Sequence, residues 1–215
     1  MADSMKVIVD PGDMVRWTDE GGRIGLVPTM GFLHAGHVSL MERLRPRVER
    51  LVVSIFVNPL QFGANEDLGR YPRDVEGDLA KCRAAGVDAV FLPERMYPEG
   101  FATEVRVRGL TEGLCGAARP THFAGVTTVV ARLFGLTRCA EACFGEKDWQ
   151  QLVVIRRMVE DLALPVRVVP GPLMRDVDGL ALSSRNAYLS TAERARALSL
   201  HRALFGLADE VARVG

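Results

Sequence analysis

The sequence has no net charge, because its 27 basic and 27 acidic residues balance. Without a global positive field the chain has no general attraction for nucleic acid or an anionic membrane, which leaves small molecules as the expected partners. It also lacks any run of the roughly 18 apolar residues that span a bilayer. Its N-terminus lacks the basic and apolar stretches of a signal peptide. We therefore expect a cytoplasmic protein.

Cysteine is scarce and unpatterned. The four cysteines are Cys82, Cys115, Cys139 and Cys143. Because none of them forms a C-x-x-C pair, the spacing favours reduced thiols over a zinc site or a disulfide framework.

Two common nucleotide-binding motifs are missing as well. The chain has no G-x-G-x-x-G, so NAD and FAD are not expected. Gly31 and Gly36 have the spacing of a P-loop, but His37 and Val38 stand where that loop needs lysine followed by serine or threonine. A Walker A site is therefore excluded.

Lysine is rare enough for its position to be informative. Only Lys6, Lys81 and Lys147 are lysines, and all other basic residues are arginine. Lys147 directly follows a predicted buried strand, where a compact ammonium suits a point contact with a phosphate. The alternative is an ordinary solvated loop lysine, because most lysines lie at the surface.

Short apolar runs rich in valine, isoleucine and phenylalanine alternate with segments of helical period. This pattern predicts an α/β fold: a Rossmann-like, mainly parallel sheet with helices on both faces. The predicted strands are residues 24–27, 51–57, 89–92, 142–144 and 166–169. Helices are expected around residues 38–48, 75–82, 126–136, 152–162 and 191–214. Residues 103–107 alternate in polarity and predict an edge hairpin.

Polar motifs stand directly after four of these strands, at residues 28–37, 58–62, 145–148 and 174–176. Open α/β sheets bind ligands beyond the carboxyl ends of their strands, so we expect the motifs to meet in one cleft. In the first motif, His34 and His37 lie in a turn before a helix, where backbone N–H groups and the helix dipole favour a phosphate. The alternative is a surface pair or a fragment of a zinc site.

One loop and two glutamines are weaker signals of the same site. Ser183, Ser184 and Arg185 lie in a predicted loop that could close on a triphosphate, although such residues are also common in ordinary turns. Gln61 and Gln151 suit hydroxyl and carboxylate groups, although a lone glutamine is usually only a surface residue.

Six segments together carry a family resemblance. They read PTMGFLHAGH at 28–37, FVNPLQFG at 56–63, YPRD at 71–74, RPTHFAGV at 119–126, FGEKDWQQL at 144–152 and DGLALSSRN at 178–186. In this order they resemble the pantothenate synthetase (pantoate-β-alanine ligase) family over nearly the whole chain. The histidine turn and the Ser-Ser-Arg loop are also similar to the signature pair of the wider nucleotidylyltransferase and class I aminoacyl-tRNA synthetase superfamily.

The resemblance implies an activity and partners. ATP and pantoate would form pantoyl-adenylate and pyrophosphate, and β-alanine would then displace AMP to form pantothenate. Mg²⁺ would accompany the ATP, and the enzyme would be a homodimer.

The resemblance also implies residue roles. ATP would be bound by Met30, Gly31, Phe32, Leu33, His34, Ala35, Gly36, His37, Gly145, Glu146, Lys147, Asp148, Met174, Leu182, Ser183, Ser184 and Arg185. The catalytic residues among these would be His37 as proton donor, His34, Lys147, Ser183 and Arg185. Gln61 and Gln151 would bind pantoate, with Gln61 also facing β-alanine. Asp78 would reach Mg²⁺ through water, and Arg119 would lie near the acceptor carboxylate.

Family members carry a sizeable second domain after the Ser-Ser-Arg-Asn loop, whereas one predicted helix follows it here. We therefore expect residues 1–177 to form a Rossmann-like nucleotide- and pantoate-binding domain and residues 178–215 to begin a truncated C-terminal lid domain. Two rival functions stay open: a related nucleotidylyltransferase that transfers AMP to a phosphate, and a nucleotide-binding or dimerisation fragment without chemistry. A tRNA ligase is disfavoured by the chain's size and neutral charge.

Overall fold

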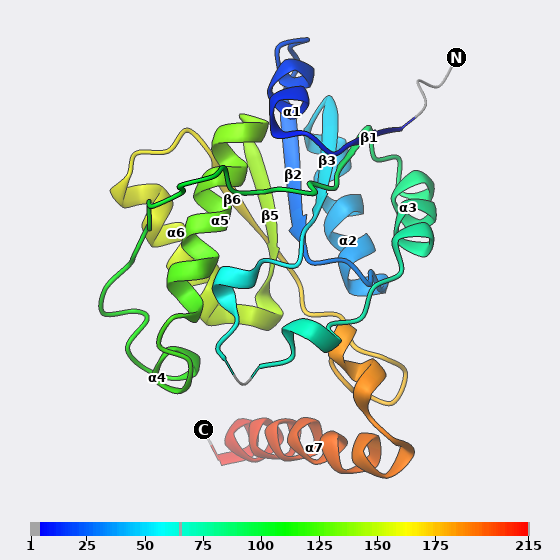
Figure 1. Cartoon of the computed structure of the whole chain (residues 1–215). Helices are drawn as coiled ribbons and strands as arrows, with labels where there is room; N and C mark the ends of the chain where they lie inside the picture. Colours follow the sequence, from blue (N-terminus) through cyan, green and yellow to red (C-terminus); the bar gives the residue numbers. More distant parts are fainter. Residues whose placement is uncertain (1–4, 65, 215) are drawn as a thin grey trace.

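A computed structural model describes residues 5–64 and 66–214 of the chain. Its centre is a six-stranded sheet in the order β1-β4-β3-β2-β5-β6, in which every neighbouring pair is parallel (Figure 1). The strands are β1 (Lys6–Ile8), β2 (Ile24–Thr29), β3 (Arg50–Ile55), β4 (Ala89–Phe91), β5 (Glu141–Gly145) and β6 (Arg167–Gly171). The predicted α/β class with a parallel sheet is confirmed.

Helices cover both faces of the sheet (Figure 1). One face packs against α2 (Ala35–Leu44) and α3 (Val75–Ala84), and the other against α1 (Pro11–Thr18), α5 (His122–Thr137) and α6 (Trp149–Asp161). The remaining helices are α4 (Cys115–Ala118) and α7 (Thr191–Val214). Short 3-10 turns are η1 (Arg45–Arg47), η2 (Pro59–Gln61), η3 (Leu68–Arg70), η4 (Glu146–Asp148) and η5 (Ser184–Tyr188).

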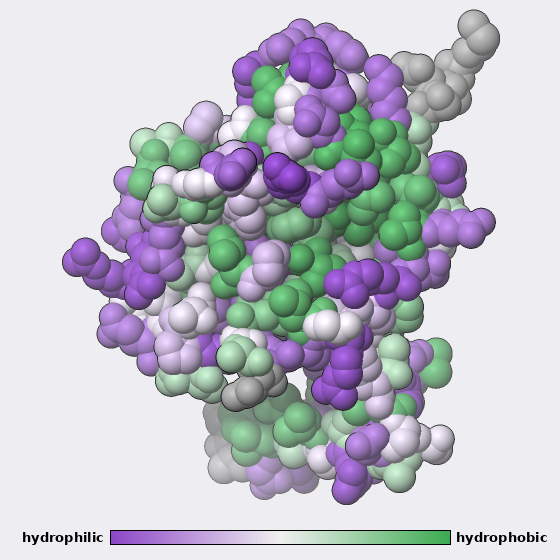
Figure 2. All heavy atoms as spheres, in the orientation of Figure 1, coloured by the Kyte–Doolittle hydropathy of each residue, from purple (hydrophilic) through white to green (hydrophobic). Residues whose placement is uncertain are grey.

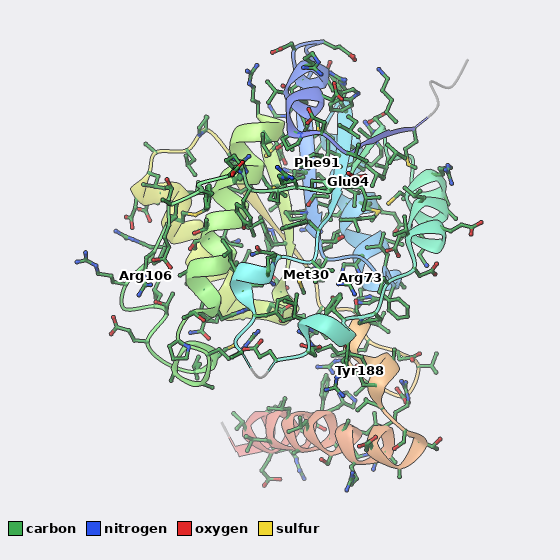
Figure 3. All side chains as sticks on the ribbon, viewed as in Figure 1. Met30, Arg73, Phe91, Glu94, Arg106 and Tyr188 are labelled. Carbon is green, nitrogen blue, oxygen red and sulfur yellow. The ribbon has the colours of Figure 1, made fainter. Side chains whose placement is uncertain are left out.

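The central strands are apolar on both sides because both sides are covered. Leu26, Val27, Val52 and Val53 are fully buried, and so is Phe91, which lies in the upper part of the molecule in Figure 3. Such continuous apolar runs are typical of parallel strands between two helical layers. On the face shown in Figure 2, hydrophobic residues gather at the centre and right, and hydrophilic residues cover the top.

Two features at the edge of the sheet differ from prediction. The chain has a strand β1 and a helix α1 that the sequence did not predict; β1 is only three residues long and pairs with β4. The predicted edge hairpin at residues 103–107 is wrong, because no strand forms there. Its backbone instead bonds to α5: Val105 N–H donates to Thr128 Oγ1 at 3.0 Å, and Thr127 Oγ1 donates to the Val105 carbonyl at 2.5 Å.

The strand order contains a reversal that positions the site. From β2 the chain proceeds through β3 to β4 on one side, and then crosses to β5 and β6 on the other side of β2. In open α/β sheets the ligand crevice lies at such a point, outside the carboxyl ends of the strands. The turn after β2 and the turn after β5 should therefore form the two walls of a cleft.

A buried carboxylate ties the opposite end of the sheet together. Glu141 begins β5, and its side chain is 3% exposed. It accepts hydrogen bonds from Arg23 and Arg47 at 2.7 Å and from Arg167 at 3.3 Å. Burial alone would raise the pKa of Glu141, but the guanidinium groups of Arg47 and Arg23 outweigh it and hold the pKa below its ordinary value of 4.5.

Replacement of Glu141 by glutamine should lower the free energy of unfolding by about 1.5 to 3 kcal/mol at pH 7, the usual contribution of hydrogen bonds to a charged group. Because the folded-state pKa lies below the ordinary value, this stabilisation is complete above pH 4.5 and is lost as the pH falls through the folded-state pKa. Urea unfolding at pH 7 and at pH 3 should therefore show a smaller difference between variant and parent at pH 3. Glu94→Gln, at an exposed position (Figure 3), is the matched control.

Helix α7 lies below the sheet and its covering helices in the view of Figure 1, at the end of the segment that follows β6. Its extent matches the predicted helix at residues 191–214. Arg194 joins it to the preceding turn through Asp176 at 2.7 Å and Asp178 at 2.8 Å. No helix in the described part of the chain is both long and apolar enough to cross a membrane.

Candidate active site

A cleft lies at the reversal point of the sheet, where the segments after β2, β3, β5 and β6 meet. Fourteen of the residues singled out in the sequence line it: Met30, His34, Gly36, His37, Gln61, Gly145, Lys147, Asp148, Gln151, Met174, Leu182, Ser183, Ser184 and Arg185. Parallel strands all end at the same edge of a sheet, which is why motifs far apart in sequence converge. Met30, just after the end of β2, marks the position of the cleft in Figure 3.

Five of the residues predicted to bind ATP do not line this cleft: Gly31, Phe32, Leu33, Ala35 and Glu146. Gly31 to Leu33 instead shape the turn through their backbone. Gly31 has φ +85° and Phe32 has φ +50°, a left-handed conformation that is unfavourable for a residue with a side chain. A compensating interaction is therefore required to hold Phe32.

Asp78, in the first turn of α3, provides that interaction. Its carboxylate accepts hydrogen bonds from the Phe32 N–H at 2.7 Å and the Leu33 N–H at 2.6 Å. The residue is 1% exposed, and burial raises its pKa despite these two bonds. Asp78 does not line the cleft, and its contact with Mg²⁺ through water stays a prediction.

Backbone N–H groups determine which ring nitrogen of His34 and of His37 carries the proton. His34 is the N-cap of α2, and its Nδ1 accepts the Gly36 N–H at 3.1 Å. The Nδ1 of His37 accepts the His34 N–H at 3.3 Å, and the two ring centroids are 4.0 Å apart. A ring nitrogen that accepts a hydrogen bond carries no proton, so each neutral imidazole carries its proton on Nε2.

Both rings are kept neutral. Burial first, and then the charge of Lys147, lower the pKa of His34. Burial, His34 and Lys147 together lower the pKa of His37 from 6.5 to about 3. At neutral pH the cleft therefore presents two uncharged N–H donors beside one ammonium group.

We expect His37 to remain in the neutral Nε2–H tautomer from pH 8 down to about pH 4.5, because its pKa in the ligand-free protein is about 3. The ¹⁵N chemical shifts of its ring nitrogens, measured across this range, test this directly. The same residue in the urea-unfolded chain is the control and should titrate near 6.5. A ring that becomes doubly protonated near pH 6 in the folded protein would contradict the expectation.

Gln61 and Gln151 line the cleft from two different segments, η2 and α6. Gln61, in η2, is buried, with its Oε1 accepting from Asn58 Nδ2 at 3.1 Å and its Nε2 directed at Met30 Sδ at 3.1 Å. Gln151, in α6, is partly exposed and lines the cleft. Its amide is therefore available to a ligand.

Asn58 and Tyr71 also line the cleft; the sequence analysis included them in motifs but gave neither a role of its own. Asn58 is 1% exposed; it donates to the Gly125 carbonyl at 3.0 Å and accepts from the Tyr97 hydroxyl at 2.8 Å. Its place directly after β3 was the available signal, because a buried amide there must have partners. Tyr71 belongs to the Tyr-Pro-Arg-Asp motif, which offered a similar signal.

The Ser-Ser-Arg-Asn turn contacts the segments that follow β2 and β3. Ser184 Oγ donates to the Phe32 carbonyl at 3.0 Å, and Arg185 forms an ion pair with Asp67, with Nε to Oδ2 at 2.9 Å. On the other wall, Lys147 Nζ lies 3.2 Å from Asp148. The predicted catalytic residues His34, His37, Lys147, Ser183 and Arg185 are thus brought to one cleft.

Arg119 takes a different position from these residues. It does not line the cleft; its guanidinium pairs with Glu66 and donates to the Gln61 carbonyl at 3.3 Å. His122 Nδ1 lies 2.9 Å from the same carbonyl. The predicted place of Arg119 near the acceptor carboxylate stays a prediction.

The sheet is parallel, its cleft lies at the reversal point, and a helix N-terminus forms part of one wall. These features are typical of α/β proteins that bind a small anionic ligand in such a cleft. A family profile described as pantoate-beta-alanine ligase matches residues 6–214. The chain therefore belongs to the pantoate-β-alanine ligase family.

Individual relatives agree with the profile. The chain is 57% identical over 206 residues to the pantothenate synthetase of Heliobacterium modesticaldum, covering 93% of this chain and 73% of the relative. It is 59% identical over 186 residues to that of Moorella thermoacetica, covering 86% and 66% of the two chains. The chain thus spans about two thirds to three quarters of these relatives' lengths.

Solved structures share the fold. The crystal structure of pantothenate synthetase from Thermus thermophilus superposes with a TM-score of 0.95 at 53% identity, covering 98% of this chain and 77% of that one. A pantoate-beta-alanine ligase from Francisella tularensis, in complex with beta-gamma ATP and β-alanine, superposes with a TM-score of 0.88 at 32% identity, covering 93% and 78%.

Proposed function

We propose that this cleft performs the reaction of its family, the ATP-dependent condensation of pantoate with β-alanine, in two steps. In the first, a carboxylate oxygen of pantoate attacks the α-phosphorus of ATP, and the bond to the bridging oxygen of pyrophosphate breaks. In the second, the amine of β-alanine attacks the acyl carbon, the bond to AMP breaks, and the amine loses a proton. The products are pantothenate, AMP and pyrophosphate.

The observation that carries the proposal is the pair of neutral imidazoles at the start of α2. Their Nδ1 atoms are occupied by backbone N–H groups, which leaves both Nε2–H groups as donors in the cleft. Negative charge builds on the phosphate oxygens as pyrophosphate leaves, and fixed donors aimed at such charge lower the barrier. The role of proton donor implied for His37 is then hydrogen-bond donation to a phosphate oxygen, because a group with a pKa of about 3 carries no extra proton at neutral pH.

Lys147 and Arg185 supply the positive charge that the histidines lack. They line the cleft on different segments, so a triphosphate between them would be held by one ammonium and one guanidinium. Ser183 adds a hydroxyl group, and the dipole of α2 favours negative charge at its N-terminus.

The pantoate site is proposed at Gln61 and Gln151. Their amides suit the hydroxyl and carboxylate groups of pantoate, and the wall of α5 suits its two methyl groups. That wall is formed by Val126, Val129, Val130 and Leu133. The acceptor carboxylate of β-alanine would approach from the side of Gln61.

Mg²⁺ is expected to arrive with the nucleotide. The described residues contain no cluster of three or more His, Cys, Asp or Glu side chains that could hold a metal, and both oxygens of Asp78 already accept backbone hydrogen bonds. The described side chains alone thus do not form a Mg²⁺ cage. Mg²⁺ is often bound mainly by substrate phosphates and water, which is consistent with this donor set.

Assembly and location follow from the family and the substrates. A homodimer is proposed from the family resemblance, and sedimentation velocity tests it. The cytoplasm is proposed because ATP is available there. Residues 1–177 would provide the histidines, Lys147 and the two glutamines, and residues 178–215 would provide the Ser-Ser-Arg-Asn turn as the beginning of a lid domain.

Exchange of labelled pyrophosphate into ATP tests the first step. Exchange that requires pantoate supports adenylation of a carboxylate, whereas exchange without pantoate would indicate transfer of AMP to another acceptor. Calorimetric titration of ATP and then pantoate completes the test. Binding of both ligands without exchange would favour a nucleotide-binding fragment without chemistry.

A further inference from the structure

We propose that Asp67 is a positioning residue for the adenylation step, and that it acts by holding the guanidinium of Arg185 so that its free edge faces the triphosphate. The inference rests on the proposed function, which places Arg185 at the ATP. Asp67 was not singled out by any motif, and it does not line the cleft. Its effect on the reaction must therefore pass through Arg185.

The contact between these two residues is bidentate. Arg185 Nε donates to Asp67 Oδ2 at 2.9 Å, and Arg185 Nη2 donates to Asp67 Oδ1 at 3.0 Å. Two parallel bonds between a planar guanidinium and a carboxylate fix the orientation of the guanidinium plane, which a single bond would not. Among the described residues, Nη1 of Arg185 has no hydrogen-bond partner, while Arg185 itself lines the cleft.

Asp67 has a further contact at its Oδ2 oxygen. The Tyr188 hydroxyl lies 3.0 Å from Asp67 Oδ2 and 3.1 Å from the Arg70 carbonyl. In Figure 3, Tyr188 lies next to η3, the turn that Asp67 begins. The hydrogen bond from Arg185 outweighs burial and lowers the pKa of Asp67, which keeps the carboxylate charged at neutral pH.

This arrangement joins two loops beside the cleft, which Arg185 lines. The Asp67 loop follows β3, and Arg185 comes from the turn between β6 and α7, 118 residues later. Ser184 anchors the same turn to the Phe32 carbonyl at 3.0 Å. Ser184 therefore places the turn, and Asp67 sets the direction of the one flexible cation on it.

A double-mutant cycle tests the inference. Asp67→Asn should raise the KM for ATP roughly tenfold to 100-fold, the effect of one hydrogen bond between charged groups, and leave the KM for pantoate unchanged. In an Arg185→Ala background, Asp67→Asn should change the KM for ATP by less than about twofold, because the group it positions is gone. Asp161→Asn, which removes a carboxylate that pairs with Arg157 on the exposed side of α6, is the matched control.

Two results would overturn the inference while the proposed function stands. In the first, Arg185→Ala raises the KM for ATP but Asp67→Asn leaves it unchanged. In the second, Asp67→Asn changes the KM for ATP equally in the parent and in the Arg185→Ala background. An ATP KM unchanged in Arg185→Ala would refute the proposed role of Arg185 and this inference with it. Tyr188→Phe gives a second measurement if Asp67→Asn fails to fold. It keeps the ion pair and removes one bond to Asp67, so a smaller rise in the same KM is expected, and no rise would contradict the inference.

Discussion

Replacement of His37 by alanine is expected to slow pantoyl-adenylate formation roughly 100- to 1,000-fold, the usual cost of removing one preorganised donor to transition-state charge. The ring is partly buried and neutral, and its Nδ1 is already bonded to the backbone, so Nε2–H is the group that the substitution removes. Pyrophosphate release in single-turnover experiments measures the effect. The thermal midpoint should fall only slightly.

His34 provides a matched pair of variants for the same prediction. It is also the N-cap of α2, and asparagine is a good N-cap residue, so His34→Asn should keep the cap while removing Nε2–H. His34→Ala should lose both. Similar pyrophosphate release in His34→Asn, His37→Ala and the parent would show that the imidazoles do not act on the phosphates.

Replacement of Gln151 by leucine is expected to weaken pantoate binding about 5- to 150-fold, because substrate groups would be left unpaired at a cost of roughly 1 to 3 kcal/mol. ATP binding should stay within about twofold of the parent. Gln151 is a cleaner site for this substitution than Gln61, because Gln61 also accepts a hydrogen bond from Asn58. Separate calorimetric titrations with pantoate and with ATP measure both affinities.

The neighbouring Gln150 is the control. Its amide bonds to the Leu110 and Gly113 carbonyls and to the Cys115 N–H, all outside the cleft lining. Gln150→Leu should therefore lower stability and leave pantoate binding unchanged. Weaker ATP binding with normal pantoate binding in Gln151→Leu would mean that the two pockets have been assigned the wrong way round.

The convergence of the motifs after β2 and β5 was predictable from local patterns. Buried parallel strands show continuous apolar runs, and polar residues directly after such runs must lie at one edge of the sheet. His34, His37 and Lys147 could be placed in this way without knowledge of the strand order. Strand β1 could not be predicted in this way, because three residues show too little periodicity to distinguish a strand from a loop.

The sequence by itself determined the α/β class, the extent of α7 and the family, because these depend on local periodicity and on motifs of contiguous residues. Only the tertiary structure decided which side chains hold the motifs in place. Asp78 bonds the backbone at Phe32 across 46 residues, and Asp67 pairs with Arg185 across 118 residues. No local sequence pattern predicts such pairs, because an aspartate is usually a surface residue and its hydrogen-bond donor here lies far away in the sequence.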